Sequence, residues 1–187
     1  IIVKDGPLTS KLKNIKIGDD IIMMPKSTGT LVLDALKPGK RLFLLSSGTG
    51  FAPFAALIRE PETYERFESI VVTHTCRMIT ELSYSQSIIQ ECRDDELLKE
   101  FIDNKLLSYH STTREDYIFN GRITELLSTN KLFNDLKINS ISSDDRFMFC
   151  GSMGLNNDLK KIMIKNNLRE GANNNPAEFV LEKAFVD

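Results

Sequence analysis

Residues 41–59 read RLFLLSSGTGFAPFAALIR, and this stretch decides the fold. The apolar run from Leu42 to Leu45 predicts a buried strand, and the glycines on either side of Thr49 predict a tight turn. A helix is predicted after the turn, because Pro53 suits a first helical turn, where a missing N–H costs nothing. Free amides at the start of such a helix attract anions, and the glycines let a phosphate approach the backbone closely. The stretch therefore predicts a nucleotide diphosphate as the ligand.

This glycine turn differs from two common phosphate-binding loops. No Gly-Lys-Ser/Thr follows it, so a Walker loop, and with it kinase or NTPase chemistry, is disfavoured. Pro53 stands where the G-x-G-x-x-G dinucleotide fingerprint has its third glycine. Taken alone, the tripeptide at residues 48–50 favours an ordinary strand-to-helix turn over a phosphate site.

After Lys40 the sequence alternates between short apolar runs and amphipathic stretches. This alternation predicts an α/β fold, a doubly wound five-stranded parallel sheet with helices on both faces. Ligands of such sheets bind beyond the carboxyl ends of the strands, so the residues that follow each strand are candidate site residues. The predicted strands are residues 42–45, 70–74, 106–110, 147–150 and 178–185, and the predicted helices are residues 53–60, 82–92, 96–101, 123–127 and 155–167.

The first 38 residues have a different pattern. Short apolar runs at residues 15–17, 20–24 and 29–33 are separated by glycine and proline, which is typical of antiparallel strands joined by turns. The tetrapeptide KPGK at residues 37–40 is a natural boundary. The sequence therefore predicts two parts, residues 1–38 and residues 39–187.

Arginines follow the second and third strands of the predicted sheet. Arg77 ends the tetrapeptide HTCR at residues 74–77, and Arg114 and Arg122 follow the third strand. Each of them alone could be a solvated charge or an ion-pair partner. A NAD site would favour an acidic residue in this region, whereas guanidinium groups suit a phosphate. Three arginines at strand ends therefore favour NADP(H), which carries an additional 2′-phosphate, over NAD(H).

Composition narrows the class of protein. With 41% hydrophobic and 27% charged residues, 187 residues can form one complete α/β domain and part of another. No apolar run is long enough to span a membrane, and the three cysteines show neither a disulfide framework nor a zinc pattern. We expect a cytoplasmic protein that binds no metal.

Charge is distributed unevenly along the chain. The first 41 residues carry eight lysines and arginines against four aspartates, a net charge of +4, and the remainder carries −6. A basic patch can steer an acidic protein partner, although solvated lysines would give the same count. Aromatic residues do not interleave with the lysines, so nucleic acid binding is not expected.

Several motifs resemble those of one known family. The sequence SSGTGFAPF at residues 46–54 is similar to the loop that opens the NADP-binding domain of the ferredoxin/flavodoxin-NADP reductases, and most similar to the bacterial type. HTCR resembles the family's His-x-x-Arg, TRE at residues 113–115 and GR at residues 121–122 resemble its 2′-phosphate elements, and FCGS at residues 149–152 resembles the floor of its nicotinamide pocket.

Both ends of the chain extend this resemblance to a flavin. DGPLTSKL at residues 5–12 resembles the segment that binds the flavin diphosphate, and AFV at residues 184–186 resembles the carboxyl-terminal segment that lies against the flavin. The resemblance implies that residues 1–38 are the last strands of an antiparallel FAD-binding β-barrel and that residues 39–187 are the NADP-binding domain. The family's Arg-x-Tyr-Ser flavin motif is absent, so we expect a chain that holds only part of a reductase.

The resemblance also implies a reaction and a set of site residues. FAD and NADP(H) would be the cofactors, hydride would pass between nicotinamide and flavin, and ferredoxin or flavodoxin would be the acidic partner of a monomeric enzyme. Cys150 and Ala184 are expected beside the reacting rings. The other cofactor-binding residues it implies are Thr9, Ser10, Ser47, Gly48, Thr49, Gly50, His74, Arg77, Thr112, Arg114, Arg122, Gly151, Ser152, Phe185 and Val186.

Three alternatives stay open. The reductase component of an oxygenase, or a flavin reductase, would share the loop and the fold. A non-catalytic module that binds NADP would keep the arginines without needing the flavin. A structural α/β domain without a ligand is the third, and the series of polar strand ends disfavours it. Composition alone makes Cys150 a buried core thiol.

Overall fold

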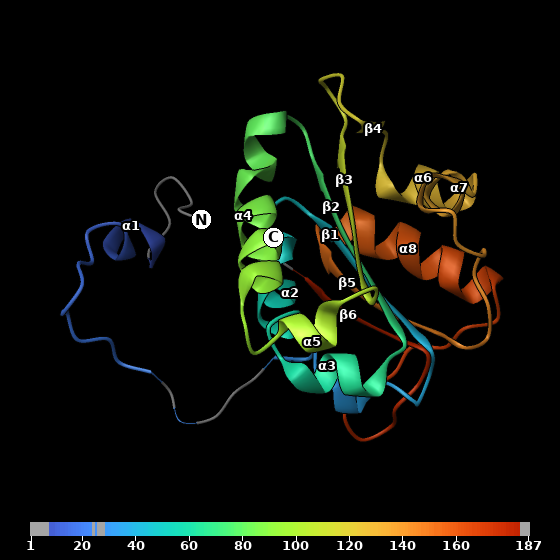
Figure 1. The fold of residues 1–187 in the computed structure, drawn as a ribbon, viewed down its shortest axis with the longest axis horizontal. Helices are drawn as coiled ribbons and strands as arrows, with labels where there is room; N and C mark the ends of the chain where they lie inside the picture. The colour runs from blue at the N-terminus through green and yellow to red at the C-terminus, as the bar shows by residue number, and fades with distance from the viewer. Residues whose placement is uncertain (1–7, 24, 26–28, 184–187) are drawn as a thin grey trace.

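The computed structural model describes residues 8–23, 25 and 29–183, and a six-stranded parallel sheet forms the centre of the fold (Figure 1). The strands are β1 (Arg41–Ser47), β2 (Ser69–Cys76), β3 (Leu106–Thr112), β4 (Phe119–Asn120), β5 (Asp145–Gly151) and β6 (Phe179–Lys183). Their order in the sheet is β4-β3-β2-β1-β5-β6. The chain therefore builds the sheet outward from β1 on one side and then returns to the other side of β1 with β5.

Helices cover both faces of this sheet (Figure 1). One face carries α2 (Ala52–Leu57), α3 (Pro61–Arg66), α4 (Ser83–Asp94) and α5 (Lys99–Ile102), and the other carries α6 (Ile123–Ser128), α7 (Lys131–Leu136) and α8 (Met153–Lys165). The predicted doubly wound sheet with helices on both faces is confirmed.

The alternation of side chains along β1 explains the two layers of helices. Leu42 and Leu44 point into the core shared with α2 and α4, whereas Phe43 and Leu45 point into the core shared with α6, α7 and α8. Phe43 stacks on Phe147 of β5, with ring centroids 4.8 Å apart. Because both faces are covered, this strand is apolar along most of its length instead of alternating between apolar and polar residues.

The structure adds elements that the sequence pattern does not predict. The edge strand β4 pairs Ser111 with Phe119 and Thr112 with Asn120, and two residues are too few to give a periodic signal. The helices α3 and α7 have six residues each, which is also too short for a helical repeat to stand out. The predicted five strands therefore become six, and all strand pairs are parallel.

The antiparallel strands predicted before Pro38 do not form in the described part of the chain. Up to residue 35 the described elements are α1 (Thr9–Leu12) and the short 3₁₀ turn η1 (Leu33–Ala35). Residues 15–23 have no neighbouring strand to hydrogen-bond with, and Ile17 and Ile22 are fully exposed. An extended segment without a partner does not form a sheet. Figure 1 shows α1 lying apart from the sheet.

Residues 31–36, in contrast, pack onto the α/β layers. The Ala177 amide donates to the Ala35 carbonyl at 3.2 Å, and the Lys37 amide donates to the Ala177 carbonyl at 2.9 Å. The buried guanidinium of Arg146 donates to the carbonyls of Lys37 and Pro38 and so anchors the linker. The boundary at residue 38 remains a prediction. The residues that pack into the α/β core begin several positions before it, at Leu31. The buried side chains of this segment are Leu31, Leu33, Ala35 and Leu36.

No helix within the described residues is long and apolar enough to cross a membrane.

Candidate functional site

The carboxyl ends of β1, β2, β3 and β5 surround a pocket of about 660 Å³. It lies beside β1, where the order of the strands reverses, which is the place where open α/β sheets bind their ligands. Both the glycine turn after β1 and the first turn of α8 line it. The predicted site residues that line this pocket are Ser47, Gly48, Thr49, Arg77, Arg122 and Ser152.

The glycine turn packs directly on the end of β5. It forms the 3₁₀ turn η2 (Gly48–Phe51), in which Gly48 has a φ of 51°, a conformation that favours glycine. A Cβ atom on Gly50 would lie 2.0 Å from the carbonyl oxygen of Cys150. A Cβ atom on Gly151 would lie 2.8 Å from Oγ of Ser47. Gly50, Cys150 and Gly151 therefore form a close-packed floor below the pocket instead of lining it.

His74 connects this turn to α4. Its ring is buried, with Nε2 2.8 Å from the carbonyl oxygen of Gly48 and Nδ1 2.7 Å from Oγ of Ser85. Burial lowers the pKa of His74, which favours the neutral ring at pH 7. A carbonyl can only accept, so Nε2 carries the proton and donates to Gly48. The Ser85 hydroxyl lies within hydrogen-bond distance of both Nδ1 and the Leu82 carbonyl oxygen. His74 thus supports the turn from below.

The hydrogen bond from His74 to the Gly48 carbonyl fixes the orientation of the peptide group between Gly48 and Thr49. In a trans peptide the C=O and N–H groups point to opposite sides. With the Gly48 carbonyl held by His74, the Thr49 amide points away from the buried ring, and both residues line the pocket. His74 is therefore a residue that orients an amide donor and does not itself line the pocket.

Replacing His74 by leucine should weaken the binding of ADP, used as a diphosphate probe, by roughly five- to tenfold, because the Gly48 carbonyl loses its donor. Glutamine, whose amide can reach the position of Nε2, should restore most of the affinity. Titration calorimetry measures both. His110 lies opposite His74 on β3 and its Nε2 has no partner, so His110→Leu is the matched control. An equal loss in both leucine variants would contradict this role.

Three arginines around the pocket carry unpaired charge. Of the nine arginines, Arg41, Arg59, Arg66, Arg146 and Arg169 hydrogen-bond through their side chains. Within the described residues the guanidinium groups of Arg77, Arg93, Arg114 and Arg122 make no hydrogen bond or ion pair. Arg77, Arg114 and Arg122 are exposed at strand ends, as predicted. Exposed, unpaired guanidinium groups at the binding edge of a sheet are suited to an anionic ligand.

A second pocket, of about 390 Å³, adjoins the first at Arg122, which lines both. Arg114 and Thr112 line it as well. The Thr112 side chain is buried, and its hydroxyl donates to the carbonyl of Glu115 at 2.6 Å, closing the turn after β3. Thr113, which the predicted set lacks, is exposed and lines both pockets. Successive side chains of a strand point to opposite sides, so Thr112 and Thr113 could not both face the pocket in the same way. This alternation is the sequence signal that could have identified Thr113.

The end of β5 supplies a helix N-terminus to the pocket. Ser152 precedes α8, and its Oγ accepts from the Leu155 amide at 3.3 Å. Burial, followed by the charge of Glu182, raises the pKa of Cys150 to about 11, so the thiol stays protonated at neutral pH and is no nucleophile. Leu155 and Asp158 also line the pocket, and the sequence pattern identified neither.

The predicted flavin-contacting residues do not meet the pocket in the described part of the chain. Thr9 and Ser10 lie in α1, apart from the sheet (Figure 1). Ala184, Phe185 and Val186 lie outside the described residues. No group of three or more histidine, cysteine, aspartate or glutamate side chains within those residues could hold a metal ion.

The fold and the site together define a class: a doubly wound nucleotide-binding domain with unpaired arginines at its binding edge. No protein-family model matches the chain. A flavodoxin/ferredoxin–NADP reductase of Rhodobacter capsulatus is 50% identical over 187 residues, which are all of this chain and 69% of that protein. A ferredoxin–NADP reductase of Azotobacter vinelandii is 41% identical over 192 residues, which cover all of this chain and 73% of that protein.

Solved structures agree on the fold. A ferredoxin–NADP reductase from Neisseria gonorrhoeae, with bound FAD and NADP, has a TM-score of 0.83 at 24% identity and matches 98% of this chain and 72% of that one. A flavohaemoglobin from Malassezia yamatoensis has a TM-score of 0.65 at 16% identity, over 97% of this chain and 42% of that one. The chain belongs to the ferredoxin/flavodoxin–NADP reductase family, a family of oxidoreductases.

Proposed function

We propose that this chain binds NADP(H) at the carboxyl edge of its sheet and passes electrons between NADP(H) and ferredoxin or flavodoxin through FAD. The observation that carries the proposal is the set of three exposed arginines, Arg77, Arg114 and Arg122, whose guanidinium groups have no partner among the described residues. The diphosphate would lie against the turn at residues 47–50 and the start of α8, and the arginines would receive the 2′-phosphate.

When bound, FAD would supply the chemistry of this proposal, which is the exchange of a hydride with nicotinamide and of single electrons with the protein partner. In this proposal the residues at the carboxyl edge of the sheet hold the nucleotide, and the flavin lies against residues elsewhere in the chain. The proposal therefore assigns FAD contacts to Thr9, Ser10 and residues 184–186, with residues 1–38 as the end of the flavin domain. Cys150 would close the floor of the nicotinamide site below Gly50.

We further propose that the protein acts as a monomer in the cytoplasm. Its cysteines Cys76, Cys92 and Cys150 are buried and free, which suits a reducing compartment. Ferredoxin and flavodoxin are the partners named for its relatives, and the basic N-terminal part would attract an acidic partner of that kind.

Replacing Arg114 by alanine should weaken NADPH binding by at least about tenfold and leave NADH binding nearly unchanged, because a hydrogen bond to a charged group contributes roughly 1.5–3 kcal/mol. Fluorescence titration of the purified protein with each nucleotide measures the two affinities. Arg93→Ala is the matched control, since Arg93 is also unpaired but lines neither pocket. Equal losses for NADPH and NADH would contradict the assignment of the 2′-phosphate.

A non-catalytic module that binds NADP is the second candidate, because the pocket beside the glycine turn and the unpaired arginines would hold NADP without the help of a flavin. A visible absorption spectrum of the same preparation distinguishes the two. Flavin bands that bleach on addition of NADPH support the reductase, whereas colourless protein that still prefers NADPH to NADH supports the module.

A further inference from the structure

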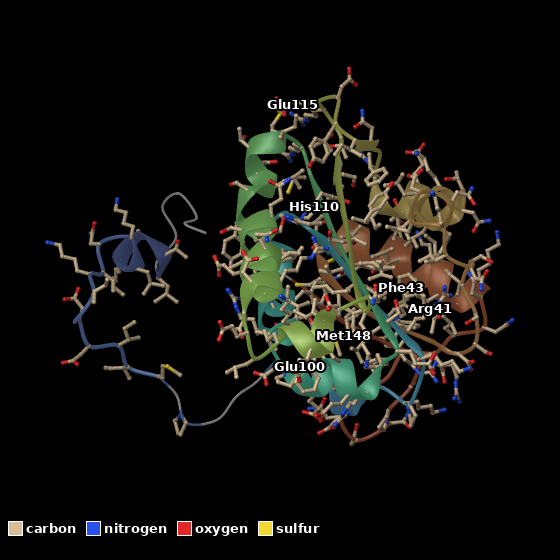
Figure 2. All side chains as sticks on the ribbon, viewed as in Figure 1. Arg41, Phe43, Glu100, His110, Glu115 and Met148 are labelled. Atoms are coloured by element: carbon tan, nitrogen blue, oxygen red, sulfur yellow. The ribbon has the colours of Figure 1, made fainter. Side chains whose placement is uncertain are left out.

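The loops that carry Arg77 and Arg114 are joined to each other, and a carboxylate makes one of the bonds. Beyond the end of the β2–β3 ladder, the Arg114 amide donates to the Arg77 carbonyl at 3.1 Å. The Ile79 amide, two residues after Arg77, donates to Oε2 of Glu115 at 2.5 Å. Through these two bonds, the consecutive residues Arg114 and Glu115 are both attached to the loop that carries Arg77. Figure 2 labels Glu115 at the end of the molecule where these loops lie.

Beyond the backbone bond at Arg77, no strand in the described part of the chain holds the Arg77 loop, so its shape there depends on side chains. Oε2 of Glu81 accepts from the amides of Arg77 and Met78, at 2.8 and 3.1 Å. Glu81 closes the loop locally, whereas Glu115 comes from the neighbouring loop. Backbone bonds join the two loops as far as Arg77, and Glu115 is the side chain that fixes the next part of the Arg77 loop, at Ile79, relative to the Arg114 loop.

We propose that Glu115 is a positioning residue for recognition of the 2′-phosphate: by holding the Ile79 amide it sets the separation of the Arg77 and Arg114 guanidinium groups. This inference rests on the proposed function of the arginines. Two guanidinium groups bind one phosphate well only when both reach it without a change in backbone.

The sign of the effect separates this role from a purely electrostatic one. A carboxylate beside a phosphate site repels the phosphate, so removal of its charge alone should strengthen binding. Loss of the bond to Ile79 should weaken binding. Glutamine removes the charge and keeps a side-chain oxygen that can accept from Ile79, whereas alanine removes both.

The test compares the affinities of 2′-phospho-AMP and AMP for the purified protein by titration calorimetry. Glu115→Ala should bind 2′-phospho-AMP roughly 5- to 20-fold more weakly while its affinity for AMP stays within about twofold. Glu115→Gln should bind 2′-phospho-AMP as tightly as the unmodified protein, or slightly more tightly. Glu125→Gln is the matched control, because Glu125 and Glu115 both line the pocket of about 390 Å³. The Glu125 carboxylate has no partner among the described residues, so loss of its charge should not weaken binding.

Each other outcome has a definite meaning. If both Glu115 variants bind 2′-phospho-AMP more tightly, the carboxylate acts only through its charge and the proposal is wrong. If Glu115→Ala loses affinity equally for 2′-phospho-AMP and AMP, the bond to Ile79 maintains the fold without serving phosphate recognition, and the proposal is again wrong. If Arg114→Ala leaves the ratio of the two affinities unchanged, Arg114 does not bind the 2′-phosphate, and the proposed function on which this inference rests is wrong.

Discussion

Alanine at position 50 should destabilise the protein by about 3 kcal/mol and weaken NADPH binding by more than about tenfold, since overpacking against a fixed backbone costs 1–3 kcal/mol or more. A Cβ atom on Gly50 would lie 2.0 Å from the carbonyl oxygen and 2.5 Å from the carbonyl carbon of Cys150. Neither atom can move aside as the tip of a side chain can. The glycine turn must lift away from β5, and with it the amides that face the diphosphate.

Urea unfolding measures the first effect and nucleotide titration of the folded fraction measures the second. Gly154→Ala is the matched control, because a Cβ atom there would lie 4.0 Å from its nearest neighbour, Oγ of Ser152. Gly154 lies in the first turn of α8, so this variant should change the stability by less than about 1 kcal/mol. Because Gly154 also lines the pocket, it is a control for stability alone. A Gly50→Ala protein of unchanged stability would show that the turn does not depend on contact with β5.

The sheet could be predicted from the sequence because its central strands are buried on both faces. Such strands are apolar along their length, and β1, β2 and β5 stand out for that reason. The strand β4 could not be predicted, since it consists of two residues held by the edge of β3. The N-terminal strands were predicted from local pattern, but a strand also needs a neighbour, and the described residues provide none.

The arginines of the site could be predicted from the sequence, whereas the residues that place them could not. The topology of a parallel sheet brings the carboxyl ends of its strands to one edge, so the sequence alone identified Arg77, Arg114 and Arg122 as candidate ligand-binding residues. The roles of Glu81 and Glu115 depend on which backbone amides their carboxylates reach, and no spacing in the sequence records that. Leu155 and Asp158 were missed because neighbouring residues carried the family pattern, and Thr113, which stands in the TRE motif, was left out of the predicted site residues in favour of Thr112.

The polar groups of the site therefore divide into two sets. The buried set, which includes His74, Ser85 and Thr112, is hydrogen-bonded internally and fixes the backbone of the turns. The exposed arginines make no internal bonds. A site prepared in this way keeps its cations free for an anionic ligand while its amide donors are already oriented, which lowers the entropy lost on binding.

The opposite end of the sheet gives the second large prediction: Asp145→Asn should lower the free energy of unfolding by about 3 kcal/mol, because it leaves the largely buried guanidinium of Arg41 without its charged partner. Both oxygens of the buried Asp145 carboxylate accept from Arg41, from Nε and Nη2 at 2.6 Å each, and one also accepts from the Ser142 amide. Arg41 also donates to the carbonyls of Asn139 and Ser140, so the pair ties the start of β1 to the loop before β5.

Urea unfolding of Asp145→Asn and Asp144→Asn separates this effect from the loss of any surface charge. Asp144 pairs with Lys40 at 3.8 Å and both side chains are more than half exposed, so its replacement should cost less than about 1 kcal/mol. The double variant Arg41→Leu/Asp145→Leu should be more stable than Asp145→Asn, since no unpaired charge stays buried. Because the pair lies at the amino ends of the strands, far from the glycine turn, folded Asp145→Asn should bind NADPH with unchanged affinity. A loss of stability equal to that of Asp144→Asn would mean that the buried pair contributes no more than an exposed one.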